Sequence, residues 1–196
     1  MKEILFILFS VILIDNLVLS KFLGICSFIG LSKSLKSAMG MSVAVIFVMF
    51  VSTAVTYPIF YQFLKPYNLD YLQTVVFILV IASVVQVLET VMKKAMPPLY
   101  RAMGIYLPLI TTNCAILGVM LLNMTEAYTF WEAIFSSVGA GIGYMLAMFL
   151  FAGVRSKMEK ADLPHFMRGL PATFMAAAIV SVSFMGFAGI LENIFG

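Results

Sequence analysis

Long uncharged stretches alternate with short charged connections along the chain of 196 residues. A first segment, 4–32, carries only two charged residues, Asp15 and Lys21. The later stretches contain no Asp, Glu, Lys or Arg and span 37–64, 71–88, 102–125, 133–154 and 169–191. Because a helix of about 20 apolar residues crosses the hydrocarbon core of a bilayer, this pattern predicts six transmembrane helices with short connections. We expect an all-α integral membrane protein, with residues 1–196 forming one membrane domain.

The composition supports a lipid environment. Hydrophobic residues make up 63% of the chain and charged residues 11%, whereas a soluble domain has about 25% charged residues. The net charge of +3 is small and dispersed, and no nucleic-acid-binding motif is present, so we expect no nucleic-acid partner. A catalytic Ser/His/Asp set, a phosphate loop and a dinucleotide fingerprint are also missing from the sequence, which argues against a soluble-type enzyme.

The basic residues predict the orientation of the six helices. Connections one, three and five hold nine Lys and Arg residues, whereas the N-terminus and connection two hold only Lys2 and Lys65. The nine are Lys33, Lys36, Lys93, Lys94, Arg101, Arg155, Lys157, Lys160 and Arg168. Since positive connections stay in the cytoplasm, both termini should lie outside. In a bacterial cytoplasmic membrane this is the periplasmic face.

The two halves of the chain resemble each other. Cys26-Ser27-Phe28-Ile29-Gly30-Leu31 matches Cys114-Ala115-Ile116-Leu117-Gly118-Val119 as Cys, small, apolar, apolar, Gly, apolar. Residues 38–42 match 139–143, and 88–89 match 191–192, in the same order. With three helices in each half, the second half must enter from the opposite face, which predicts an inverted 3+3 repeat of about 1–95 and about 96–196. Chance similarity among apolar helices is the alternative.

Both cysteine segments look like interrupted helices. Segment 4–32 is too long for one upright crossing, and Asp15 and Lys21 divide it. Segment 102–125 carries Gly104, Pro108 and the polar run Thr111-Thr112-Asn113 directly before Cys114. We therefore expect the first and fourth helices to be broken around Cys26 and Cys114. Broken helices at matching places in inverted halves predict a site at the membrane midplane.

Cys26 and Cys114 are the only cysteines. Taken singly, each could be a small buried hydrophobic residue, and a disulfide between them is a second simple explanation. Their equivalent positions favour a shared metal site, but two thiolates do not complete a four-coordinate site. The only histidine, His165, falls in connection five and is expected to be a loop residue. A metal would therefore need two further ligands from another chain.

The chain is similar to the A subunits of Rnf ion-translocating electron-transport complexes, over essentially its whole length. The stretches that carry the resemblance are Lys21-Phe22-Leu23-Gly24-Ile25-Cys26, Gly30-Leu31-Ser32-Lys33, Pro97-Pro98-Leu99-Tyr100-Arg101 and Gly104-Ile105-Tyr106-Leu107-Pro108-Leu109-Ile110-Thr111-Thr112-Asn113-Cys114-Ala115. The E subunit of the sodium-pumping NADH:quinone reductase is a near relative, although residues 117–123 look more like the Rnf branch. The resemblance implies a homologous E subunit of opposite topology, with which Cys26 and Cys114 would hold a [2Fe-2S] cluster.

The resemblance also implies a function. Such a complex passes electrons between reduced ferredoxin and NAD through flavin and iron-sulfur subunits (B, C, D and G) and couples this flow to Na⁺ or H⁺ transport. This chain would carry electrons through the membrane and would not be catalytic alone. A secondary transporter with an inverted-repeat fold is the alternative, and a structural membrane scaffold is a third possibility that leaves the paired cysteines unexplained.

Several further residues carry expectations of their own. Thr111, Thr112 and Asn113 either donate hydrogen bonds to cluster sulfurs or satisfy backbone groups freed by Pro108. Asp15 is either a cation ligand or a helix cap. Glu89 lies four residues before Lys93, which predicts a helix-surface ion pair. The glycines at 139, 141 and 143 predict close helix packing.

Overall fold

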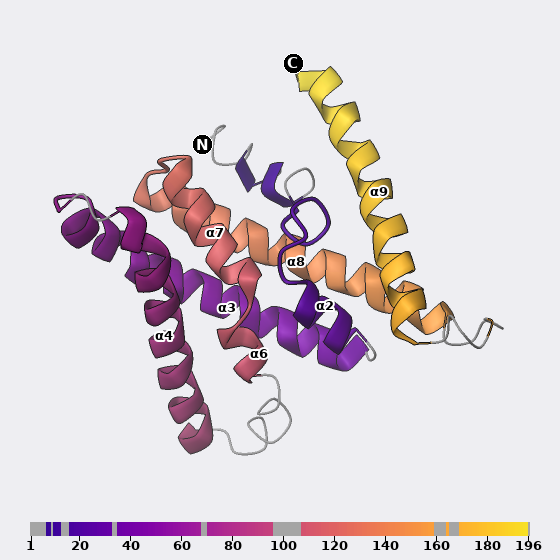
Figure 1. The fold of residues 1–196 in the computed structure, drawn as a ribbon, viewed down its shortest axis with the longest axis horizontal. Helices are drawn as coiled ribbons and strands as arrows, with labels where there is room; N and C mark the ends of the chain where they lie inside the picture. Colours follow the sequence, from indigo (N-terminus) through magenta and orange to yellow (C-terminus); the bar gives the residue numbers. More distant parts are fainter. Residues whose placement is uncertain are drawn as a thin grey trace.

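The computed structural model describes residues 7–8, 10–12, 16–32, 35–67, 70–95, 107–158, 164 and 169–195, and these residues contain helices and connections but no β-strand (Figure 1). The expectations for Asp15 and His165 fall outside the described residues, as do those for Pro97–Arg101 and Gly104. The helices are α2 (Ile25–Leu31), α3 (Leu35–Ile59), α4 (Gln73–Ala95), α6 (Leu107–Thr111), α7 (Cys114–Thr125), α8 (Phe130–Met158) and α9 (Leu170–Phe195). A π-helical turn, η1 (Phe60–Leu64), extends α3, and a 3₁₀ turn, η2 (Asp70–Leu72), precedes α4.

Three helical stretches of the described chain are long and apolar enough to cross a membrane: Ser37–Leu64, Gln73–Val91 and Phe130–Met158. Two shorter apolar helices cover Leu109–Thr125 and Leu170–Gly186. Large apolar side chains such as Phe47, Leu79 and Ile179 are exposed on these helices, as expected for surfaces that face lipid. The prediction of an all-helical, multi-span membrane protein is therefore confirmed, while the count of six spans, the inverted repeat and the broken first and fourth helices stay predictions.

Close contact at glycines joins α8 to α3 and to the N-terminal segment. A Cβ on Gly141 would lie 2.7 Å from Ile46 Cγ1 and 3.2 Å from Ile46 Cα on α3. A Cβ on Gly143 would lie 3.2 Å from the main-chain oxygen of Ile12. Helices in lipid associate through such small residues because they allow the backbones to approach. The predicted role in close helix packing is confirmed for Gly141 and Gly143, whereas a Cβ on Gly139 would make only an ordinary contact at 3.5 Å.

The end of α3 lies beside the start of α8. Pro58 cannot donate a backbone hydrogen bond, and the helix continues beyond it as the π-helical turn η1. Tyr57 donates from its hydroxyl to the main-chain oxygen of Tyr128 at 3.2 Å, and its ring packs edge-on against Phe130 at 5.3 Å. The connections after α3 and after α7 therefore lie at the same end of the bundle, as alternating membrane crossings require.

Helices α4 and α9 pack on the outside of this core. On α4, Lys93 Nζ lies 3.4 Å from Glu89 Oε1, so the predicted helix-surface ion pair is confirmed. On α9, the Ser181 hydroxyl donates to the main-chain oxygen of Leu19, which ties the helix to the segment that leads into α2. Helix α2 packs against α3, and α7 packs against both α3 and α8 (Figure 1).

Candidate functional site

The structure brings the two cysteine segments together. The main-chain N–H of Gly24 donates to Cys114 Sγ at 3.0 Å, although the two residues lie 90 positions apart in the chain. Cys26 follows Gly24 by two residues and lies in the first turn of α2, whereas Cys114 is the first residue of α7. Both cysteines are free thiols, so no disulfide joins them. Cys26 is exposed and Cys114 half-buried, which leaves both open to a further chain.

Gly24 is the contact point between the two segments. Its φ of +82° is left-handed, a conformation that other residues adopt at a cost. A Cβ at this position would lie 3.0 Å from Asn113 Oδ1 and 3.1 Å from Ala115 Cβ. Both the backbone conformation and the packing therefore require glycine here, and a larger residue would push α2 away from α7.

The polar run before Cys114 separates two helices. Helix α6 ends at Thr111, and α7 begins at Cys114, with Asn113 as its N-cap. Asn113 Oδ1 accepts a hydrogen bond from the Ala115 N–H at 3.1 Å, which satisfies one of the unpaired donors at the start of the helix. Asn113 is 2% exposed, and its Nδ2 has no hydrogen-bond partner in good geometry among the described residues. Thr112 is exposed, and Thr111 is half-buried.

Tyr144 and Ser27 support the segment that carries Cys26, and the sequence analysis singled out neither residue. The buried Tyr144 of α8 donates from its hydroxyl to Ser27 Oγ at 2.9 Å, and Ser27 donates to the main-chain oxygen of Gly24 at 2.8 Å. A tyrosine directly after the Gly-x-Gly-x-Gly run was the available signal, because a polar group in an apolar span needs a partner.

A buried arginine holds the other end of α2. Arg155 Nη1 donates to the main-chain oxygen of Ile29 at 2.6 Å and to Ser32 Oγ at 2.8 Å. Only 8% of Arg155 is exposed. The sequence analysis counted it among the residues of connection five, but it lies in the last turn of α8 and contacts the C-terminal end of α2. A cation is favourable there because it meets the partial negative charge of a helix C-terminus.

Asn16, a buried residue in the segment that leads into α2, has a structural role. Its Nδ2 donates to the main-chain oxygen of Gly143 at 2.9 Å, and its Oδ1 accepts from the N–H groups of Val18 and Leu19. Both ends of the amide are therefore used by the backbone. This removes one of the few polar groups that a transported solute could contact.

The described residues fit half of a metal centre. Within the ranges that the structure describes, no three His, Cys, Asp or Glu side chains gather closely enough to hold a metal ion. The two thiol segments are in contact, partly exposed and accompanied by an unpartnered buried donor on Asn113. A four-ligand iron site is compatible with this arrangement only if another chain supplies the remaining ligands.

Comparison with known proteins places the chain in a family. Residues 4–191 match the family model described as "Rnf-Nqr subunit, membrane protein". The chain is 50% identical over 186 residues to the A subunit of the Na(+)-translocating ferredoxin:NAD(+) oxidoreductase complex of Acetobacterium woodii, an alignment that covers 95% of this chain and 97% of that protein. It is 45% identical over 193 residues to the A subunit of an ion-translocating oxidoreductase complex of Syntrophotalea carbinolica, with 98% and 100% covered. It is 46% identical over 192 residues to the protein of the same name in Pasteurella multocida, again with 98% and 100% covered. The chain therefore belongs to the Rnf-Nqr family of membrane subunits.

Proposed function

We propose that this chain is the A subunit of a redox-driven ion-translocating ferredoxin:NAD⁺ oxidoreductase complex, in which it provides two of the four ligands of an intramembrane [2Fe-2S] cluster. The observation that carries the proposal is the 3.0 Å contact between the Gly24 N–H and Cys114 Sγ. It brings the segment of Cys26 against the thiol of the other half of the chain. The names and high identity of the relatives support the same role.

The surroundings of the thiols suit thiolate ligands. Cys114 lies at the N-terminus of α7, where the helix dipole favours negative charge and lowers the cost of a thiolate in lipid. The Gly24 N–H already donates to its sulfur. Hydrogen bonds to ligating sulfurs stabilise the added electron and so raise the reduction potential of an iron-sulfur centre. Asn113 Nδ2, which is buried and has no hydrogen-bond partner in good geometry among the described residues, is the proposed second donor.

The homologous E subunit is the proposed source of the missing ligands. Cys26 and Gly30 lie four positions apart on α2, and both are exposed in this chain. A Cβ on Gly30 would meet nothing within 4 Å. A second helix can approach closely along such a face. The exposed face of α2 is therefore the proposed interface with the E subunit, whose two cysteines would complete the site.

The cluster, when bound, supplies a one-electron carrier inside the hydrocarbon layer. A unit of charge added there is costly in a low dielectric and favours a nearby cation. Three hydrogen bonds hold the segment of Cys26: Tyr144 donates to the Ser27 hydroxyl, Ser27 donates to the main-chain oxygen of Gly24, and Arg155 donates to the main-chain oxygen of Ile29. Such bonds fix the thiols so that little reorganisation accompanies electron transfer. We propose that the charge of the added electron, by attracting a cation, couples electron flow to the movement of Na⁺ or H⁺.

The proposed setting is a bacterial cytoplasmic membrane, with six spans in an inverted 3+3 repeat and both termini outside. The contact of Tyr57 with Tyr128 supports this arrangement, since it places connections two and four at one end of the bundle. The B, C, D and G subunits are the expected further partners. Reporter fusions test the topology: alkaline phosphatase should be active when fused after Lys65 and inactive when fused after Lys94. Activity after Lys94 would contradict the orientation.

Single substitution of each cysteine in the purified complex tests the ligand role. Cys26→Ala and Cys114→Ala should each remove two iron atoms per complex and abolish one EPR signal, with ferredoxin-driven ion transport lost as well. Ser83→Ala serves as the control because its exposed hydroxyl on α4 donates to the main-chain oxygen of Leu79 on the same helix. If either cysteine variant co-purifies with all subunits and keeps full iron content, the ligand assignment is wrong.

The partner surface has its own test. Gly30→Leu adds bulk to the exposed face of α2, where a Cβ would meet no other element of the described structure within 4 Å. We expect the variant chain to insert normally but to lose co-purification of the E subunit. Gly153→Leu, on an open position of α8, is the matched control. Equal recovery of the E subunit with both variants would place its interface elsewhere.

A further inference from the structure

Tyrosine and tryptophan side chains gather at one end of the bundle, where connections two and four run. Trp131, the only tryptophan of the chain, lies there in the first turn of α8. Five of the six tyrosines among the described residues lie at the same end: Tyr57, Tyr61, Tyr67, Tyr71 and Tyr128. The sixth is Tyr144, which supports the segment of Cys26. The aromatic end of the bundle, which comprises Trp131 and the five tyrosines, is therefore separate from the cysteine site.

Ring contacts join α3, η1 and α8 at this end. Tyr57 packs on Tyr61 with ring centroids 4.6 Å apart and packs edge-on against Phe130 at 5.3 Å. Phe130 in turn packs edge-on against Trp131 at 5.9 Å. The ammonium of Lys65 lies 4.7 Å from the centroid of the Tyr61 ring, which is a favourable position for a cation. The rings thus hold the ends of two apolar helices together, with one positive charge beside them.

The exposed aromatic residues differ in kind along the helices. Tyr67, Tyr71 and Trp131 are 71%, 78% and 66% exposed, and no other Tyr or Trp of the described chain is exposed. Further along the spans the exposed aromatic residues are phenylalanines, such as Phe47 and Phe149. Tyr and Trp favour a boundary because the ring is apolar while the hydroxyl or N–H needs a polar partner. A bilayer imposes this order by depth, whereas contact with another protein does not require it.

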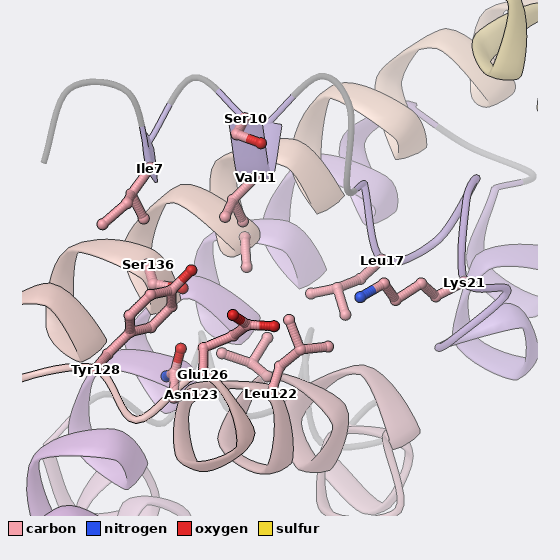
Figure 2. A pocket seen from close by; sticks show the side chains of 12 residues that line it. Ile7, Ser10, Val11, Leu17, Lys21, Leu122, Asn123, Glu126, Tyr128 and Ser136 are labelled. Atoms are coloured by element: carbon pink, nitrogen blue, oxygen red, sulfur yellow. The ribbon is translucent and has the colours of Figure 1, made fainter. Parts of the chain in front are cut away.

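Charged groups at the same end mark the limit of the apolar spans. The apolar stretch Ser37–Leu64 ends directly before Lys65. The exposed Glu126, at the C-cap of α7, and Tyr128 line a cavity of about 200 Å³, into which the Glu126 carboxylate extends (Figure 2). Charges are costly inside hydrocarbon, so Lys65 and Glu126 must reach water or lipid headgroups. Tyr61 precedes Lys65 by one helical turn, which places the aromatic end at this boundary.

We propose that the aromatic end is a membrane anchor that lies in the phospholipid headgroup layer, with Tyr67, Tyr71 and Trp131 among the headgroups and Lys65 beside the lipid phosphates. In the proposed topology this is the outer leaflet. Interfacial aromatic and basic residues set the depth and tilt of membrane helices. The anchor would therefore fix the depth of α3 and α8, against which the cysteine segments pack. It depends on neither thiol, so it stands or fails independently of the iron-sulfur proposal.

Tryptophan fluorescence measures this depth, because Trp131 is the only tryptophan of the chain. The full chain is reconstituted in phosphatidylcholine vesicles whose acyl chains carry bromine either near the glycerol or near the middle of the chain. Trp131 should be quenched more strongly by the bromine near the glycerol. The matched control, Trp131→Phe with Phe47→Trp, moves the tryptophan to an exposed position of α3 that lies about 15 Å further along the helix than Tyr57. There the order of quenching should reverse.

Photo-crosslinking in the assembled complex identifies the neighbour of the anchor. Illumination of the complex with Trp131→p-benzoylphenylalanine should attach phospholipid to this chain, which mass spectrometry detects as an increase in mass absent from the dark control. The proposal is overturned if the crosslink joins another subunit, if no lipid is attached, or if Trp131 is quenched as strongly by the deeper bromine. Iron content and EPR of the Trp131→Phe complex should match those of wild type, which separates failure of the anchor from failure of the cluster site.

Discussion

Arg155 of α8 and Ile29 of α2 are joined by a 2.6 Å hydrogen bond across 126 residues of sequence. The same guanidinium bonds to Ser32 Oγ at the C-cap of α2. Helix α2 has seven residues, too few to be stable as an isolated helix. Its position therefore depends on contacts at its two ends: Gly24 against α7 and Arg155 against the last turn. The position of Cys26 is therefore fixed by contacts at both ends of α2.

Replacing Arg155 with Met should loosen α2 while keeping an unbranched apolar chain in place of the buried stem of the arginine. The main-chain oxygen of Ile29 and the Ser32 hydroxyl would each lose their bond to Arg155, at a cost of about 2–3 kcal/mol. We expect a lower unfolding midpoint of the complex and a broadened EPR signal, because Cys26 would occupy several positions. Lys157→Met, which removes an exposed charge from the same helical turn, should stay within about 0.5 kcal/mol of wild type. Equal behaviour of the two variants would contradict the role of Arg155.

Gly24→Ala should separate the two cysteine segments. The added methyl group would meet Asn113 Oδ1 and Ala115 Cβ at about 3 Å, and the left-handed backbone adds about 1 kcal/mol of strain. Iron content should fall even though both thiols remain. Gly153→Ala is the control, since its Cβ meets nothing within 4 Å and alanine favours the helix. Full iron content in Gly24→Ala would show that the contact between Gly24 and Cys114 is dispensable.

Asn113→Ser removes the amide donor Nδ2 of Asn113 while keeping an oxygen that can cap α7. Serine is as good an N-cap as asparagine, so α7 should still begin at Cys114. Loss of Nδ2 removes a hydrogen-bond donor that, in the proposed cluster site, would stabilise the reduced state. If that donor is worth about 1 kcal/mol, the midpoint potential falls by roughly 40 mV for one electron. Redox titration followed by EPR measures the shift. An unchanged potential would leave Asn113 with its capping role alone.

Sequence patterns predicted those features that depend on local composition. Hydropathy and length identified the spans within 37–64, 71–88 and 133–154, because burial in lipid needs only an uninterrupted apolar run. The ion pair of Glu89 with Lys93 followed from helical spacing. The packing role of Gly141 followed from the need of helices in lipid for small contact residues.

The supports of the cysteine segments were not predictable in this way. Tyr144 with Ser27, and Arg155 with Ile29, are pairs whose partners lie more than 100 positions apart. Arg155 was assigned to an aqueous connection because charge alone marks the end of a span, whereas its side chain turns inward to bond to a helix end. Local pattern does not specify which distant backbone group a polar side chain will meet. Neither the burial of these polar residues nor the identity of their partners was predicted from the sequence.

The packing of α8 on α3 offers a comparison between two glycines on one helix. Gly141→Ala would place a methyl group 3.2 Å from the main-chain Cα of Ile46, so the two helices must move apart. Overpacking of this kind costs about 1–3 kcal/mol. Gly139→Ala places its methyl group no closer than 3.5 Å to Leu8, an ordinary contact, and gains about 1 kcal/mol of helix propensity. Thermal unfolding of the two purified complexes should therefore shift in opposite directions. If Gly139→Ala lost as much stability as Gly141→Ala, the close approach of α8 to α3 at Gly141 would not explain the loss.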